Sequence, residues 1–231
     1  MDRKIVVLLG HPGAGKGTQA KEIMRLMGIP QISTGDMLRD AIARQMLFGA
    51  EARALMDGGH LVSDNIVNEI VAERIRQSDC RSGFILDGYP RTVQQAETFE
   101  KELRPDDQMF VVEISADAAS IGDRLIGRLM CSGCGDIYNV HSRTPLSRGV
   151  CDRCGKELIA RSDDRKDLIK ERFKHYNDET YPLVKHYQKK GCYHQVDGMR
   201  PIAEVTREIL AILDGEEAMA PVARGGNKSL A

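Results

Sequence analysis

Residues 10–19, which read GHPGAGKGTQ, place one lysine and one threonine among four glycines. The apolar run KIVVLLG at 4–10 leads into this stretch, and a helical pattern follows it. Glycines let the backbone curl so that its N–H groups point inward, and the start of a helix adds positive potential. Lys16 would then reach the outer phosphates of a nucleotide. A glycine-rich turn with a surface lysine is the alternative, but the flanking strand and helix favour a phosphate-binding loop.

Cysteines form the second group that could do chemistry. Four of the six lie in two Cys-x-x-Cys pairs, namely Cys131, Cys134, Cys151 and Cys154. The sixteen residues between the pairs match the spacing of a four-thiolate zinc ribbon, and four protein ligands leave no open position for catalysis. We therefore expect a structural zinc site, with two disulfides or unliganded buried cysteines as alternatives. Cys80 and Cys192 are isolated, which suits a reducing compartment better than a disulfide framework.

The elements that must position these groups alternate along the chain. Apolar runs rich in β-branched residues predict strands covered on both faces, at 4–10, 29–33, 83–88, 109–115 and 192–198. Helical patterns fill the gaps, at about 16–27, 35–57 (broken near Gly49), 63–77, 92–103, 116–130, 163–189 and 201–213. The sequence therefore predicts an α/β protein with a P-loop NTPase-type parallel sheet flanked by helices.

Several helix ends carry their own signals. Ser115 and Ser162 are placed to cap the helices that follow them. Asp163 and Asp164 would add favourable charge to the start of the second of these helices. Pro182 should kink or split that long helix.

Composition excludes some classes of protein. The chain has 231 residues and a net charge of −1, so it can bury a core but offers no large basic field for nucleic acid. Its apolar runs fall short of the roughly twenty residues that a membrane span requires, and the N-terminal run is too brief for a signal peptide. We expect a cytoplasmic protein without membrane or nucleic-acid partners, and a disordered tail at 215–231.

The phosphate-binding loop differs from the usual pattern, because Gly17 stands between Lys16 and the hydroxyl of Thr18. The resulting GxPGxGKGT resembles the nucleoside monophosphate kinases, the adenylate kinase family in particular. Seven further stretches resemble that family's segments in order: ISTGDMLRDAI, MDGGHLVSDNIV, GFILDGYPRTVQQAE, DRLIGR, ARSDD, KERF and VDGMRPIAEV. The resemblance covers roughly residues 4–213.

The resemblance implies a division of the chain and a reaction. A core of 1–32, 63–126 and 165–214 would carry a small helical AMP-binding insertion at 33–62 and a zinc-ribbon-like lid at 127–164. The implied reaction transfers a phosphoryl group from ATP, bound with Mg²⁺, to AMP and gives two ADP, in a monomer. Because AMP is already an ionised phosphate, no general base is required, and positioning together with cations carries the catalysis.

The family pattern also assigns individual residues. Six cations would line the phosphate path: Lys16, Arg91, Arg124, Arg128, Arg161 and Arg172. All of these except Arg128 are assigned to catalysis. Arg124 and Arg128 lie four apart on one predicted helix and so should share a face. ATP would contact Gly13, Ala14, Gly15, Lys16, Gly17, Thr18, Arg124, Arg128, Ile137, Tyr138 and Arg200. AMP would contact Thr34, Arg39, His60, Leu61, Val62, Gly88, Tyr89, Pro90, Arg91, Gln95, Arg161 and Arg172.

Two further assignments depend on the same resemblance. Asp87 would orient magnesium through water. Thr34 with Gln95 favours adenine, since related pyrimidine kinases tend to carry a small apolar residue at the position of Thr34. A UMP or CMP kinase therefore remains the alternative within this class.

The cysteine pairs fall between Arg128 and Arg161, within the implied lid. A lid that excludes water protects ATP from hydrolysis, and so short and polar a segment needs metal support to fold. A zinc-ribbon module that binds nucleic acid, with a regulatory P-loop, is the alternative from another class. It predicts basic and aromatic residues near the cysteines, but among Phe, Tyr and Trp the segment contains only Tyr138.

Overall fold

A computed structural model of the chain describes residues 3–44, 49–58 and 60–215. Its main sheet is five-stranded and parallel, with the order β2-β3-β1-β4-β8. The strands are β1 (Lys4–Leu9), β2 (Gln31–Ser33), β3 (Gly83–Asp87), β4 (Gln108–Ser115) and β8 (Tyr193–Asp197). All five predicted strands are confirmed, within a few residues at each end.

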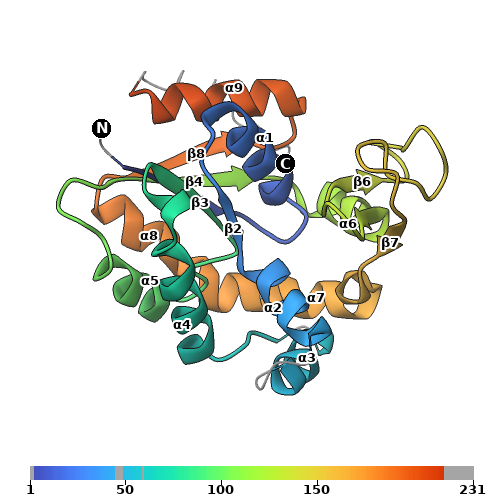
Figure 1. Ribbon diagram of the computed structural model, residues 1–231, viewed down its shortest axis with the longest axis horizontal. Helices are drawn as coiled ribbons and strands as arrows, with labels where there is room; N and C mark the ends of the chain where they lie inside the picture. Colours follow the sequence, from blue (N-terminus) through green and yellow to red (C-terminus); the bar gives the residue numbers. More distant parts are fainter. Residues whose placement is uncertain (1–2, 45–48, 59, 216–231) are drawn as a thin grey trace, which may run out of the picture.

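Helices cover both faces of this sheet (Figure 1). On one face lie α1 (Lys16–Met27) and α9 (Ile202–Leu213), and on the other lie α4 (Asp64–Ile75), α5 (Val93–Glu100) and α8 (Pro182–Lys189). Val6 and Leu8 pack in the cluster that includes the first face's helices, whereas Val7 packs toward the second. Because side chains alternate between faces, a strand buried on both sides must be apolar throughout.

A helical insertion follows β2. It consists of α2 (Thr34–Ala43) and α3 (Gly49–Asp57), and a short 3₁₀ turn, η1 (Ser78–Cys80), comes later, before β3. The hydroxyl of Ser33 caps α2 by accepting a hydrogen bond from the backbone N–H of Asp36, at 3.3 Å. The predicted 35–57 helix is thus two helices; residues 45–48, between them, lie outside the described part of the chain.

A second, small sheet is antiparallel and has the order β6-β5-β7. Its strands are β5 (Arg128–Cys131), β6 (Ile137–Asn139) and β7 (Leu158–Ala160). The prediction of a helix over 116–130 is wrong in its last part, because α6 (Ala118–Ile126) ends before Gly127. A Cβ on Gly127 would lie 2.9 Å from Val140 Cγ2, so a larger residue here would require the side chains at the end of β6 to move.

The boundaries of α6 correct two further expectations. Asp117, not Ser115, caps the helix, because its carboxylate accepts a hydrogen bond from the backbone N–H of Ser120, at 2.8 Å. Arg124 lies on α6 whereas Arg128 begins β5, so the two arginines do not share a helix face.

The long late helix is interrupted. It consists of η2 (Ser162–Asp164), α7 (Lys166–His175), a π-helical turn η3 (Tyr176–Thr180) and α8, which begins at Pro182. The predicted split at this proline is confirmed. Arg165 rather than Ser162 occupies the N-cap position of α7, so the cap prediction is wrong.

Two remaining expectations concern membrane contact and the tail. Among the described residues, no helix is long and apolar enough to cross a membrane. The predicted disorder at 215–231 falls almost entirely on residues 216–231, which lie outside the described part.

Candidate active site

The phosphate-binding loop joins β1 to α1. Gly10, Gly13 and Gly15 adopt positive φ angles of 134°, 86° and 109°, which side chains with a Cβ rarely tolerate. A Cβ on Gly13 would also lie 2.9 Å from Ile121 Cγ2 of α6. The glycine pattern is therefore required both by the curl of the loop and by the helix packed against it.

Lys16 is held across this loop. Its Nζ donates hydrogen bonds to the carbonyl oxygens of Gly10 and His11, at 2.6 and 3.0 Å. Burial and, to a smaller extent, the positive charges of Arg91 and Arg172 together lower the pKa of Lys16 to about 8, against the opposing effect of Asp87. Neighbouring cations lower one another's pKa because their charges repel. A bound polyanion would relieve this repulsion, so such a site favours polyanions.

A cavity of about 620 Å³ opens beside the loop. Every residue predicted to contact ATP lines it: Gly13, Ala14, Gly15, Lys16, Gly17, Thr18, Arg124, Arg128, Ile137, Tyr138 and Arg200. Its wall includes residues of β3, of α6 and of the small sheet, which lie far apart in the sequence.

A smaller cavity of about 70 Å³ adjoins it. Most residues predicted to contact AMP line the smaller cavity: Thr34, Arg39, His60, Leu61, Val62, Gly88, Arg91, Gln95, Arg161 and Arg172. Arg91, Arg161 and Arg172 line both cavities and so lie along their junction. Pro90 lines the larger cavity.

Tyr89 is the predicted contact that neither cavity includes. Its side chain is only 2% exposed and packs in the core. The phenol donates its one hydrogen bond to Asn68 Oδ1 at 2.8 Å, and the carbonyl oxygen of Gln95 lies 3.2 Å away as an alternative acceptor. The sequence could not show that this side chain turns inward while its neighbours line a cavity.

A hydrogen-bond network orders the wall of the smaller cavity. The hydroxyl of Thr34 and Nε of Arg91 both donate to the carbonyl oxygen of Gly88, at 2.9 and 2.8 Å. The backbone N–H of Arg91 donates to Gln95 Oε1 at 2.7 Å, and Gln95 Nε2 donates to Asp64 Oδ1 at 2.6 Å. Asp64 was not expected from the sequence, and it fixes the orientation of the Gln95 amide.

Two aspartates hold the arginines at the junction. Arg161 Nε donates to Asp163 Oδ1 at 3.0 Å, while Arg128 Nε and Arg172 Nη1 donate to the carboxylate of Asp164, at 2.6 and 2.8 Å. Burial alone would raise the pKa of Asp163, but Arg161 and Arg172 hold it well below its usual range. The sequence predicted only helix-start charges here. The position of these aspartates between two assigned arginines was the signal that could have revealed the ion pairs.

Arg124 and Arg200 lie where the loop meets the turn after β8. Arg124 donates to the carbonyl oxygen of Gly198 at 3.0 Å and to that of Ala14 at 3.4 Å. Arg200 pairs with Glu208 of α9. These contacts hold both arginines in the wall of the larger cavity.

Asp87 ends β3 at the cavity wall. Gln31 Nε2 donates to its Oδ2 at 3.0 Å, and a Cβ on Gly17 would lie 3.3 Å from the same oxygen. A carboxylate beside the phosphate-binding loop is the kind of hard oxygen ligand, direct or through water, that Mg²⁺ prefers. The residues present therefore fit magnesium.

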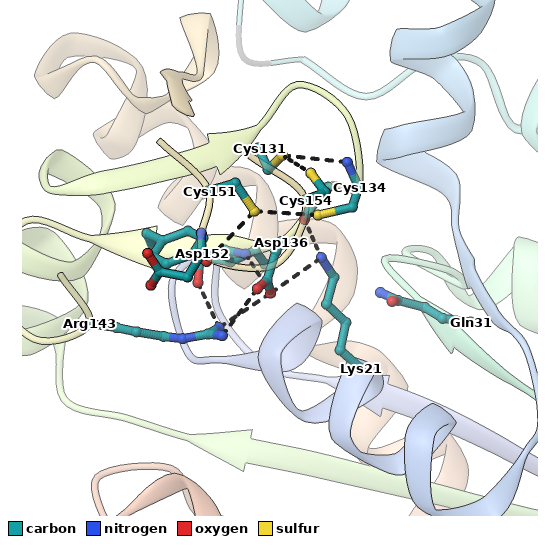
Figure 2. Close-up of polar contacts among 12 residues, drawn as sticks. Lys21, Gln31, Cys131, Cys134, Asp136, Arg143, Cys151, Asp152 and Cys154 are labelled. Carbon is teal, nitrogen blue, oxygen red and sulfur yellow. Dashed lines mark hydrogen bonds and ion pairs between the residues drawn. The ribbon is translucent and has the colours of Figure 1, made fainter. Parts of the chain in front are cut away.

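The four paired cysteines come together in the small sheet (Figure 2). Their Sγ atoms all lie within 4.8 Å of one another, with Cys131 to Cys154 at 3.3 Å and Cys134 to Cys151 at 3.6 Å. All six cysteines are free, so the structure contains neither alternative disulfide. Ligands at about 2.3 Å in a tetrahedron are separated by roughly 3.8 Å, and the cluster could hold a metal ion of that kind.

Comparison with known proteins decides the family. A sequence model described as Adenylate kinase matches residues 8–192. The Adenylate kinase of Allorhizobium ampelinum is 49% identical over 213 residues, which cover 91% of this chain and 99% of the relative. That of Archaeoglobus fulgidus is 44% identical over 211 residues, covering 90% and 97%. The chain belongs to the adenylate kinase family. It is therefore a phosphotransferase.

The adenylate kinase match includes every predicted site residue except Arg200. His60, one of the predicted AMP contacts within the match, also contacts α7: its Nδ1 lies 3.1 Å from Nε2 of His175.

Proposed function

We propose that this adenylate kinase family member catalyses reversible transfer of the terminal phosphoryl group of ATP to AMP, giving two ADP by direct in-line displacement. The observation that carries the proposal is the set of partly buried cations that passes from the phosphate-binding loop to the junction of the two cavities. ATP would occupy the larger cavity and AMP the smaller. Their phosphates would then meet beside Arg91, Arg161 and Arg172.

We assign the cations an electrostatic role. Lys16, Arg91, Arg124, Arg161 and Arg172 would neutralise charge that spreads over the phosphoryl group as it moves. Asp163 and Asp164 pre-position Arg161 and Arg172, and Asp164 also holds Arg128, so little reorganisation is needed when substrates bind. Asp87 would orient Mg²⁺ through water, and the ion would supply additional positive charge to the ATP phosphates, which Thr18 would help to hold.

On the acceptor side, we assign adenine selection to Thr34 and Gln95. Both are buried in the wall of the smaller cavity, and the Asp64 contact holds the Gln95 amide in one orientation. A site that fixes its hydrogen-bonding groups in advance rejects bases that cannot pair with them. This arrangement supports AMP over UMP or CMP as acceptor.

For the small sheet, we propose a structural Zn²⁺ on the four cysteines, in a lid formed by residues 127–164. The helical insertion at 33–62 would form the AMP-binding part, with the remaining segments to residue 214 as the core. Arg143 of the lid pairs with Asp136 and lies over the ring of Tyr138, at 5.1 Å from its centroid. Because these two side chains serve the lid's own structure, they argue against a nucleic-acid surface, and we propose a cytoplasmic monomer without such partners.

Acceptor specificity tests the proposed function. In a spectrophotometric assay of ADP formation from ATP, we expect AMP to give a kcat/KM at least about 100-fold above that of UMP or CMP, since mismatched bases leave the fixed amide unpaired. Preference for a pyrimidine acceptor would reject the adenylate assignment. No ADP with any acceptor would reject the proposed reaction.

The lowered pKa of Lys16 predicts that ATP binding takes up protons. With a pKa of about 8 before binding, the lysine is half charged at pH 8, and bound phosphates should raise that pKa toward its ordinary value. Binding at pH 8 should therefore take up roughly half a proton, and affinity should fall as the pH rises above 8. Calorimetry in buffers of different ionisation enthalpy measures the uptake. A binding enthalpy independent of the buffer would contradict the prediction.

A further inference from the structure

Lys21 joins α1 to the cysteine-bearing sheet, although the sequence assigned it no role (Figure 2). Its Nζ donates a hydrogen bond to the carbonyl oxygen of Gly135 and lies 4.0 Å from Asp136 Oδ1. Gly135 and Asp136 directly follow Cys134 in the sequence. The Lys21 side chain is only 18% exposed, and it reaches from α1 to this turn at the wall of the larger cavity.

The cysteine pair and its turn fix the groups that Lys21 meets. The backbone N–H of Gly135 donates to the carbonyl oxygen of Cys131 at 3.1 Å, and the N–H of Cys131 donates to the carbonyl oxygen of Asp136 at 2.8 Å. Arg143 holds the Asp136 carboxylate through contacts at 3.2 and 3.4 Å. The acceptors for Lys21 therefore have a position that the fold of the small sheet determines.

The next residue of the turn contacts the phosphate-binding loop. Ile137 lines the larger cavity, and a Cβ on Gly17 would lie 3.1 Å from Ile137 Cδ1. Residues 135–137, which we call the knuckle, thus rest on the first two turns of α1. The same turns carry Lys16 and Thr18, which are assigned to the phosphates.

Burial makes the Lys21 contact depend on lid position. Burial lowers the pKa of Lys21, whereas Asp136 raises it. Burying an ammonium without an acceptor costs free energy. The arrangement in which the knuckle rests on α1, which we call closed, is therefore favoured only because the knuckle supplies Lys21 with an acceptor. Movement of the knuckle away from α1 would break the contact with the Gly135 carbonyl.

We propose that Lys21 is a positioning residue for lid closure, which holds the knuckle against α1 and so stabilises the closed, ATP-binding arrangement. The inference deepens the proposed function and rests on it. A ligand that needs the closed lid binds more tightly when the free protein already populates that state. If lid opening limits turnover, the same contact slows product release.

Lys21→Met tests this role, because methionine keeps an unbranched apolar side chain but removes the charge. We expect affinity for the non-hydrolysable ATP analogue adenylyl imidodiphosphate to fall about threefold to tenfold, as for the loss of one hydrogen bond. Affinity for AMP should change less than about twofold. In turnover, the KM for ATP should rise by a similar factor, with kcat unchanged or higher.

Two variants provide controls. Arg25→Met removes a cation one turn further along α1, where Arg25 is 66% exposed and pairs with Glu22. It should leave both affinities unchanged. Lys21→Arg retains a cation and should recover most of the lost affinity. Metal content should match that of the unmodified protein in all three variants.

Nuclear magnetic resonance of the nucleotide-free protein separates lid closure from direct contact with ATP. The amide signals of Asp136 and Ile137 should shift in Lys21→Met but not in Arg25→Met. Unchanged signals, an unchanged analogue affinity, an equal loss of AMP affinity, or a fall in kcat at constant KM would each overturn the proposal. If the unmodified protein bound the analogue but made no ADP, the proposed function would fail, while the affinity and signal comparisons would still test Lys21.

Discussion

Replacing Lys16 with methionine is expected to reduce kcat by at least about 1000-fold while the protein remains folded. Lys16 lies among the phosphate-binding glycines and is partly buried, and its ammonium is held by two carbonyl groups of the loop. Methionine has an unbranched side chain without charge, so it removes the ammonium with little change of packing. The effect should appear in kcat because the phosphoryl group accumulates charge as it moves.

Lys4 provides a matched control for this prediction. It lies at the other end of β1, where its Nζ donates to the carbonyl oxygen of Leu213 and to Asp214. Lys4→Met should leave kcat within about twofold, because it is remote from both cavities. Steady-state kinetics with ATP and AMP, together with circular dichroism, measure both variants. Activity of Lys16→Met within tenfold of the unmodified protein would remove Lys16 from the catalytic assignment.

Arg91→Ala should have an effect of similar size for a different reason. Arg91 lines both cavities, and its guanidinium is anchored by the carbonyl oxygen of Gly88. Its loss should therefore weaken AMP binding as well as lower kcat, whereas Lys16→Met should leave AMP binding nearly unchanged.

Loss of the metal should destabilise the protein more than it alters the chemistry. We expect one zinc per chain, and we expect Cys151→Ser to lower the melting temperature by about 10 °C. The buried core of the small sheet consists of Cys131, Tyr138, Cys151 and Leu158, so little else supports this sheet. At low temperature, where the lid remains folded, the kcat of Cys151→Ser should stay within about tenfold of the unmodified protein. The reason is that no cysteine is assigned a contact with the substrates.

Cys192→Ser is the control for the metal prediction. Cys192 is partly buried beside the main core, outside the four-cysteine cluster. Its replacement should change the melting temperature by no more than about 3 °C, with the metal retained. Scanning calorimetry and metal analysis measure both outcomes. Purified protein with no metal and two disulfides, or equal destabilisation by the two variants, would contradict a structural zinc site.

The main sheet and the phosphate-binding loop could be predicted because their signals are local. Each buried strand is a short apolar run, and the loop is a fixed order of glycines between a strand and a helix. The prediction failed after Ile126, where the apolar pattern continues but the chain leaves the helix. Pairing of β5 with β6 and β7, up to about thirty residues away, decides that change.

The candidate site was predictable as a set of residues but not as an arrangement. Asp163 and Asp164 were interpreted as charges at a helix start, whereas they hold Arg161, Arg128 and Arg172 in place. Tyr89 was expected beside its neighbours at the ligand, but its ring packs in the core. Such choices depend on which side chains the folded chain places opposite one another.

Residue types at short spacing are enough to predict the phosphate-binding loop, the four-cysteine set and the order of strands and helices along the chain. Where the charges meet depends on the fold of the whole chain. That fold brings Arg91, Arg128 and Arg172 from three distant segments of the chain to the larger cavity, and it places Lys21 against Gly135, 114 residues further on. The physical reason is that a buried charge is stable only beside a partner, and the fold of the whole chain selects that partner.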